Sequence, residues 1–439
     1  MKRIKHLLRL IKESIWFYPI IYSFFALIIA IISISYDLGF FGKLDNYLPK
    51  FILMDLNIAE TVLSIIGGAF ITITTFTFST TMVVLTMYTS QYSPRVVRNF
   101  LTQKDTLKSF GVFVSGFFYV MIILLLMSNY SNGSKIISAT IGLVYVLVGL
   151  VFFFRFINSV ASYIQASNLI KRLKENAIKE IDSYKKSLKE QDIVTEVDIF
   201  DKDNYIKVES KKDGYIEEFD YNQFTKVASL YNINIHIMKV VGQFVSKKTT
   251  ICHYYAKDEL NEEDKDDIVI EIQKGFIFGE QRSEVNDFEF SIQKIVEVAL
   301  KALSPGINDP NTAIHCIRIT SLLLRDLAPF PKGYIKLEAK NSEDTKTSHV
   351  YLEAMNFEIL LLNTYLSILH YGKSDLFVVL EIIKALQIIV RESSAYNEKK
   401  IKEFTKFLWN KIIDEKFKDY EIELLKNEMK EIEIAYESN

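Results

Sequence analysis

The sequence is short of cysteine and has no basic excess, and each shortage excludes a class of protein. Two cysteines in 439 residues, Cys252 and Cys316, lie too far apart for a disulfide framework and fit a reducing compartment. The formal net charge of -2 leaves no basic surface to neutralise a phosphate backbone. We therefore expect no nucleic-acid partner.

The short motifs of common catalytic and metal sites are also missing. There is no G-x-S-x-G turn, no P-loop, no Rossmann glycine pattern and no H-E-x-x-H among six histidines. Cys252–His253 and His315–Cys316 are sequence neighbours, and neighbouring side chains point in different directions on a strand or helix. We expect no enzyme, no cofactor and no metal site, although a catalytic triad assembled in space would leave no such motif.

An acidic run, DELNEEDKDD at 258–267, lacks the ligand spacing of a calcium loop. The sequence instead predicts that Asn261 caps a helix whose first turn carries acidic residues, which the helix dipole favours.

What the sequence does have is long apolar runs, all in its first third. Hydrophobic residues make up 49% of the chain and charged residues 24%, a mixture typical of a chain divided between lipid and water. The runs are Phe17–Ser35, Thr61–Tyr88, Phe110–Met127 and Ile136–Phe154. Each approaches or exceeds the roughly 20 residues that a helix needs to cross a bilayer. We predict a transmembrane domain over 17–155.

Basic residues predict the orientation of these spans. Residues 1–16 resemble an interfacial amphipathic helix, although a signal peptide also begins with a basic segment before an apolar run. The basic residues near span ends gather after the second and fourth runs, as Arg95, Arg98, Lys104, Lys108, Arg155, Lys171, Arg172 and Lys174. The positive-inside rule then places both termini in the cytoplasm.

The second run is rich in hydroxyl groups. Small and polar residues recur along it at alternating spacings of four and three, as Gly68, Thr72, Thr75, Ser79, Met82, Thr86, Thr89 and Ser93. This spacing lines one face of a helix. The stripe would either wall an ion path or let helices pack closely with their hydroxyls bonded to the preceding turn. In both cases we expect a helix central in the bundle. No span has a charged residue near its middle, which disfavours proton pumps and voltage sensors.

The remaining chain reads as a water-exposed α+β part. We predict a helical connector over 156–204, a small β-rich module over 205–287 and a helical domain over 288–439. In the loop SPGINDP, Asp309 is placed to cap a helix that starts with Pro310. The alternative is a corner for a ligand or a second subunit, formed by Ser304, Asn308 and Asp309.

Two segments resemble a known family. SQYSPRVVRNFL after the second run, and GEQRSEVNDFEFSIQKIVEVALKALSPGINDPNTAI further on, resemble the predicted bacterial membrane proteins of domain-of-unknown-function family 2254. The resemblance runs from the first span to around residue 330. It implies membrane helices followed by a soluble domain, in a bacterial inner membrane, and it brings no catalytic residues.

These observations predict a fold with four transmembrane helices plus a cytoplasmic α+β domain, which has a small β-rich module and a C-terminal helical bundle. The leading functional hypothesis is a homo-oligomeric channel-like protein in the lipid bilayer. Its ion path would be lined by Thr72, Thr75, Ser79, Thr86 and Thr89, with Arg95 and Arg98 at the cytoplasmic mouth. The alternative is a membrane-anchored scaffold or sensor whose cytoplasmic domain binds a protein or small ligand.

Overall fold

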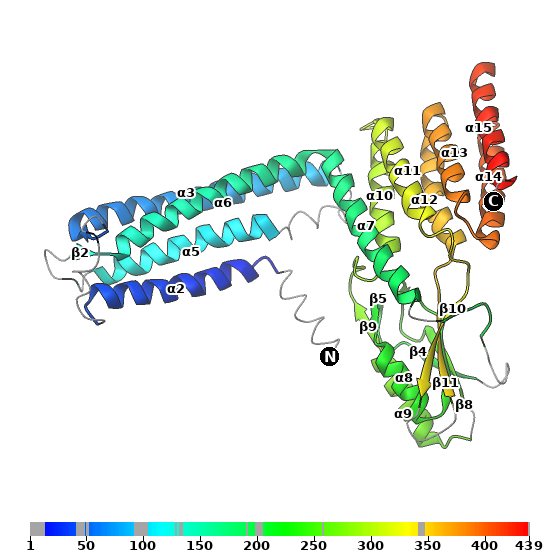
Figure 1. Ribbon diagram of the computed structural model, residues 1–439, viewed down its shortest axis with the longest axis horizontal. Helices are drawn as coiled ribbons and strands as arrows, with labels where there is room; N and C mark the ends of the chain where they lie inside the picture. Colours follow the sequence, from blue (N-terminus) through cyan, green and yellow to red (C-terminus); the bar gives the residue numbers. More distant parts are fainter. Residues whose placement is uncertain are drawn as a thin grey trace. The chain divides into compact units, whose positions relative to one another are not determined.

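The computed structural model describes residues 14–40, 49, 52–91, 104–127, 130, 135–189, 192–197, 205–256, 259–340 and 347–437. It divides into two compact units, Met1–Asn168 and Leu169–Asn439 (Figure 1). Residues 1–13 of the predicted interfacial helix, together with Arg95 and Arg98, lie outside the described residues.

The first unit is built from long apolar helices. They are α2 (Phe17–Asp37), α3 (Leu56–Gln91), α5 (Lys104–Leu126) and α6 (Ser138–Ile164). By length and composition each could cross a membrane, which confirms the four predicted spans. Two short strands, β1 (Met54–Asp55) and β2 (Lys135–Ile136), pair antiparallel at one end of the bundle.

The central helix of this bundle is α5. Half of its most apolar stretch is buried, against 28% for α2 and for α3 and 17% for α6. The expectation that the hydroxyl-rich helix α3 is central is therefore wrong. Periodicity reveals a small-residue face but not its partner, and α5 has such a face too. A Cβ atom added at Gly111 would lie 3.0 Å from the Tyr22 ring and 3.1 Å from the backbone of Tyr18, so α2 and α5 cross closely there.

One phenylalanine of α3 packs between the neighbouring helices α5 and α6. The Phe70 ring is 2% exposed and lies against glycines of two neighbours. A Cβ atom at Gly116 of α5 would lie 2.5 Å from the ring, and one at Gly149 of α6 would lie 3.1 Å from it. The ring occupies space that only glycine leaves free, and it fixes the rotation of α3 about its own axis.

A carboxylate closes the end of the bundle that carries β1 and β2. Asp37, the last residue of α2, accepts hydrogen bonds from the amides of Ile137 (2.7 Å) and Ser138 (3.2 Å) at the start of α6. The side chain of Ile137 itself makes no capping bond, so Asp37 caps α6 from another helix.

The second unit begins with α7 (Ala166–Lys189) and continues as mixed sheet and helix. Its strands are β3 (Asp192–Val194), β4 (Ile206–Glu209), β5 (Gly214–Phe219), β6 (Ile233–Ile237), β7 (Phe244–Val245), β8 (Thr250–Ala256), β9 (Phe276–Gly279), β10 (Tyr334–Lys340) and β11 (Thr347–Glu353). Its other helices are α8 (Tyr221–Leu230), α9 (Glu262–Lys274), α10 (Phe288–Ala302), α11 (Pro310–Arg325), α12 (Phe357–Gly372), α13 (Leu376–Val390), α14 (Ala395–Ile412) and α15 (Asp419–Glu437).

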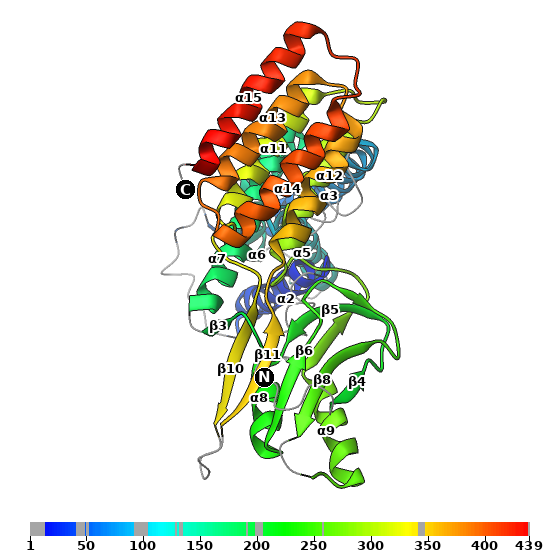
Figure 2. The same ribbon diagram turned by 90° about the vertical axis from the view of Figure 1, so that its right-hand side faces the viewer.

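Six strands form one sheet in the order β3-β10-β11-β6-β8-β4, in which only β11 and β6 are parallel (Figure 2). A second sheet has the order β7-β5-β9. Isoleucines of β6 and valine and leucine of β11 alternate into a core that α8 covers. The segment 288–439 was predicted as helical, and β10 and β11 differ from that expectation. Their period-two alternation, YIKLEAK and TSHVYLE, explains the difference.

The helices from α10 onward pack in two layers. In one layer α12 packs on both α10 and α14, and in the other α13 packs on both α11 and α15, which Figure 2 shows as a row. Stacked helix pairs of this kind bury a continuous apolar core between neighbours. The predicted caps Asn261 of α9 and Asp309 of α11 are confirmed, with Pro310 in the first turn of α11.

Candidate functional site: the hydroxyl face of α3

The two faces of α3 differ in chemistry. One face packs into the bundle and is mostly apolar, with Ala59, Leu63, Ile66, Phe70, Thr77, Val84 and Tyr88 buried. The other face carries the hydroxyl stripe, and its described members, Gly68, Thr72, Thr75, Ser79, Met82, Thr86 and Thr89, are all exposed. At 3.6 residues per turn the two sets lie on opposite sides of the helix. The polar face therefore lies on the outside of the bundle of one chain.

Several of these hydroxyls bond to their own helix. Thr72 donates to the carbonyl of Gly68, and Thr86 to that of Met82, both at 2.9 Å. Thr74, Thr77 and Thr81, which lie off the stripe, donate in the same way. This satisfies the hydroxyl proton in an apolar surrounding and leaves the oxygen lone pairs facing outward.

The middle of the stripe is different. Thr75 and Ser79 make no such bond among the described residues, so at this level the helix surface can both donate and accept hydrogen bonds. Large apolar side chains flank the stripe, with Val83 on one side and Phe78 on the other, 67% and 54% exposed. The outer surface of α3 is thus a strip of hydroxyl groups with exposed apolar side chains on both sides.

The other predicted site residues have local roles. Ser304 donates to the carbonyl of Lys301 (2.6 Å), and Asp309 accepts bonds from the amide (3.1 Å) and the hydroxyl (2.6 Å) of Thr312. Asn308 takes the left-handed conformation, with φ +49. These contacts account for the corner as a helix cap, and ligand or subunit binding there stays a prediction.

Both cysteines are buried, and their thiols stay protonated. Cys252 faces the core of the six-stranded sheet, and its neighbour His253 faces the opposite side, stacked on the Tyr205 ring with centroids 4.2 Å apart. Burial raises the pKa of both the Cys252 and Cys316 thiols. In the part of the chain that the structure describes, no group of three His, Cys, Asp or Glu side chains is placed to hold a metal ion.

Sequence reasoning missed a buried charge network in the motif GEQRSEVNDFEFSIQK. The Arg282 guanidinium binds the Asp287 carboxylate through two nitrogens, at 2.6 and 3.0 Å, and donates to the amide oxygen of Gln293 at 3.1 Å. Lys294, only 4% exposed, pairs with Glu284. The signal was available, because charged residues in a segment that leads into a buried helix must be paired.

This network also holds α7. The amide of Asn286 donates to the Glu180 carboxylate of α7 (2.9 Å), and Asn176 of α7 donates to Glu284 (3.1 Å). Gly242 lies against the network, because a Cβ atom there would lie 1.9 Å from Asp287 and its φ is +86. The helix that opens the second unit is thereby fixed to the loop before α10.

Glu289, in the first turn of α10, makes this region sensitive to pH. Burial raises the pKa of Glu289 from 4.5 to about 7, which the Asp287 carboxylate reinforces and the Arg282 charge opposes. Because the pKa of Glu289 is higher in the folded state than in the unfolded state, protonated Glu289 stabilises the fold. This contribution is fully present below pH 4.5 and is lost as the pH rises to about 7.

We expect Glu289→Gln to remove a decline of roughly 1 kcal/mol per pH unit in that window. Urea unfolding of both proteins between about pH 4 and pH 8 measures the difference. Parallel pH profiles would contradict the prediction.

Long apolar helices followed by an α+β unit define a polytopic helical membrane protein. The chain belongs to the family described as predicted membrane protein DUF2254, whose model matches residues 12–388, and the resemblance of the two motifs is confirmed. It is similar to uncharacterised proteins of Mycobacterium bovis and Mycobacterium tuberculosis, each 22% identical over 273 residues, or 62% of this chain and 52% of the relative. The chain thus spans about half the length of these curated relatives. No solved structure matches it.

Proposed function

We propose that this membrane protein assembles into a homo-oligomer in which copies of α3 surround a path for ions, lined by Thr72, Thr75, Ser79, Thr86 and Thr89. The exposure of the whole hydroxyl stripe carries the proposal. A polar strip directed at lipid gains nothing from its hydroxyls, whereas the same strip on neighbouring copies can face water and ions. A path inside one chain is excluded for this stripe, since the stripe faces away from the bundle core.

The chemistry of the strip favours permeant cations or water within the span. Hydroxyls that have donated their protons to the helix present only acceptor oxygens, which replace water around a cation. Arg95 and Arg98 would form a basic ring at the mouth and favour anions there. The hydroxyl oxygens would act on ions inside the membrane span, and the arginines would act on ions at its cytoplasmic mouth.

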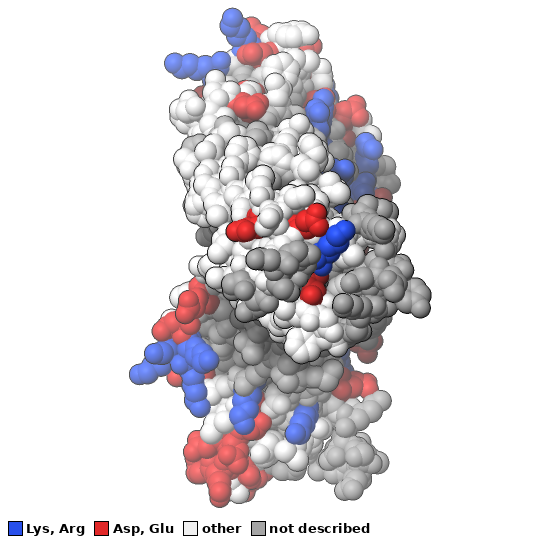
Figure 3. All heavy atoms as spheres, turned by 90° about the vertical axis from the view of Figure 1, so that its left-hand side faces the viewer, with Lys and Arg blue, Asp and Glu red and all other residues white. Residues whose placement is uncertain are grey.

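The orientation is part of the proposal. In the sequence, the loops that connect α2 to α3 and α5 to α6 carry only Lys43, Lys50 and Lys135 as basic residues. In Figure 3 the described atoms at this end of the first unit are mostly white, with few blue groups. The opposite end carries Lys104, Lys108 and Arg155. The positive-inside rule places that end, and both chain termini, in the cytoplasm of a bacterial cell with an inner membrane.

Ion flux through purified protein in liposomes tests the path. We expect Thr75→Trp and Ser79→Trp to reduce flux to the level of protein-free vesicles, because an indole at mid-span fills a narrow pore. Leu147→Trp is the matched control, since Leu147 on α6 is 63% exposed and lies away from the stripe. It should leave flux unchanged.

Two results would overturn the ion path. One is no wild-type flux across a broad range of salts, pH and membrane tension. The other is the same flux in all three tryptophan variants with the assembly intact. Cysteines at Thr75 and Ser79 give a second readout, because the native Cys252 and Cys316 are buried. Protection of both new thiols from water-soluble reagents would weigh against a water-filled path.

The second candidate function is a membrane-anchored scaffold or sensor. It is favoured by the fixation of α7 to the buried network, since α7 is the helix that follows the last membrane span. A partner bound to the second unit could act through α7 on the membrane helices. If the protein is a scaffold or sensor, deleting the spans should leave partner binding intact. If it is an ion path, the same deletion should abolish ion flux.

A further inference from the structure

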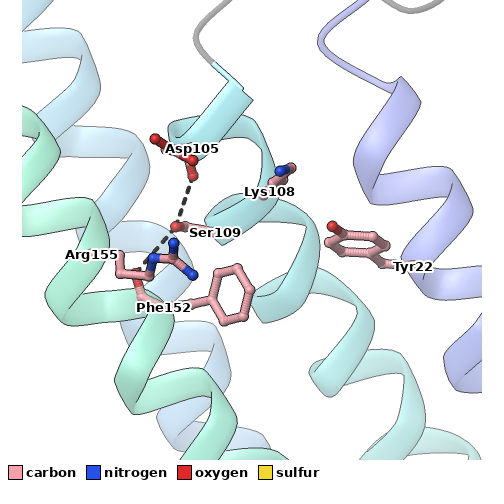
Figure 4. A pocket seen from close by; sticks show the side chains of 6 residues that line it. All are labelled: Tyr22, Asp105, Lys108, Ser109, Phe152 and Arg155. Carbon is pink, nitrogen blue, oxygen red and sulfur yellow. Dashed lines mark hydrogen bonds between the residues drawn. The ribbon is translucent and has the colours of Figure 1, made fainter.

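A small pocket opens at one end of the first unit, between α2, α5 and α6, with a volume of about 130 Å3. Its lining residues are Tyr22, Asp105, Lys108, Ser109, Phe152 and Arg155 (Figure 4). Lys108 precedes the apolar run that begins at Phe110, and Arg155 follows the run that ends at Phe154. The pocket therefore lies where apolar helix surface gives way to polar surface, at the depth of lipid head groups.

The two cations in this pocket have aromatic rings as neighbours, and the one acid that lines it, Asp105, is paired with neither of them among the described residues. The Lys108 ammonium lies 5.9 Å from the centroid of the Tyr18 ring, and the Arg155 guanidinium lies 5.8 Å from that of Phe152. Within the described ranges neither cation makes a salt bridge. A phosphate is the anion that lipid supplies at this depth, and Arg and Lys bind it with charge-assisted hydrogen bonds.

The floor of the pocket is fixed by Ser109. Its hydroxyl is buried and its one proton lies within reach of two carbonyl oxygens, those of Asp105 on α5 (2.9 Å) and of Phe152 on α6 (3.1 Å). This links the two helices that carry the cations. In Figure 4 the Tyr22 hydroxyl points toward α5 on the Lys108 side, where it adds a donor.

The remaining lining group distinguishes among lipids. The Asp105 carboxylate is exposed and repels a phosphate, but it accepts hydrogen bonds from whatever follows the phosphate. An ethanolamine ammonium or a glycerol hydroxyl can donate such a bond, and a choline group cannot. The volume is well below the roughly 300 Å3 of small-molecule sites, which fits a single phosphate and excludes a nucleotide.

We propose that this pocket binds the phosphate of a membrane glycerophospholipid between Lys108 and Arg155, with Asp105 accepting a hydrogen bond from a donor in the head group. The acyl chains would lie on exposed apolar side chains of α6, such as Val151 and Phe154, which are 57% and 68% exposed. The site uses α2, α5 and α6, so it stands or falls independently of the ion path along α3.

Native mass spectrometry of the full chain in mild detergent tests the site. The probe is an equimolar mixture of phosphatidylethanolamine and phosphatidylcholine with the same acyl chains. We expect the variant Lys108→Gln/Arg155→Gln to retain both lipids about thirtyfold more weakly than wild type, since each cation near the phosphate contributes several-fold. We expect Asp105→Ala, which removes the acceptor oxygens, to keep the lipid but lose the preference for phosphatidylethanolamine.

The matched control is Lys171→Gln/Lys174→Gln, which removes the same charge from α7 without touching the pocket. Equal lipid retention in the control and pocket variants would reduce Lys108 and Arg155 to general anchors and overturn the site. Displacement of the lipid by millimolar inorganic phosphate would identify a soluble-anion site instead. A wild type without head-group preference would overturn the role of Asp105.

Discussion

We expect Asp287→Ala to lower the free energy of unfolding of the second unit by about 3–5 kcal/mol. The Asp287 side chain is 2% exposed and binds two nitrogens of Arg282. It also accepts a hydrogen bond from the Phe290 amide at 2.9 Å, which caps α10. Alanine removes the cap and leaves a half-buried guanidinium without its anion, and a charge left unpaired costs far more than a lost surface bond.

Tryptophan fluorescence measures this loss, because the chain has two tryptophans, Trp16 and Trp409. In a Trp16→Phe background, urea unfolding followed through Trp409 of α14 reports on the second unit alone. Asn261→Ala is the control, since Asn261 caps α9 from an exposed position. We expect that variant to lose about 1 kcal/mol. Similar losses in the two variants would show that Asp287 acts as a cap only.

The features predicted correctly from the sequence are local. An apolar run long enough to cross a bilayer forms a helix whatever surrounds it, because only a helix satisfies its backbone inside lipid. The caps at Asn261 and Asp309 depend on a side chain and an amide three residues away. In both cases the sequence that decides the structure is contiguous.

The features that could not be predicted depend on pairs far apart in the chain. The stripe on α3 is visible as a period, but its outward direction depends on Phe70 meeting Gly116 and Gly149. Strand β11 joins the sheet because Val350 lies beside Ile235 of β6. The charge network likewise needs Gly242 to come close to Asp287. Periodicity and capping rules contain no information about such partners.

The contact between Phe70 and Gly116 predicts the largest effect in the membrane unit. We expect Gly116→Ala to destabilise the first unit by about 1–3 kcal/mol, because the added methyl group would lie 2.5 Å from the ring and must push α3 from α5. Gly68→Ala is the matched control on α3. A Cβ atom there meets nothing within 4 Å, and alanine is the better helix former, so we expect a neutral or slightly stabilising change.

Thermal unfolding in detergent should show a lower midpoint for Gly116→Ala and an unchanged or slightly higher one for Gly68→Ala. Gly116→Ala combined with Phe70→Leu should recover part of the loss, since leucine frees space beside α5.

The displacement of α3 by Gly116→Ala also bears on the proposed ion path, because the Phe70 ring sets the rotation of α3 and with it the direction of Thr75 and Ser79. A cysteine at Thr75 should therefore change its reactivity toward water-soluble reagents in the Gly116→Ala background and keep it in the Gly68→Ala background. Unchanged reactivity in both would separate the packing of Phe70 from the placement of the hydroxyl stripe.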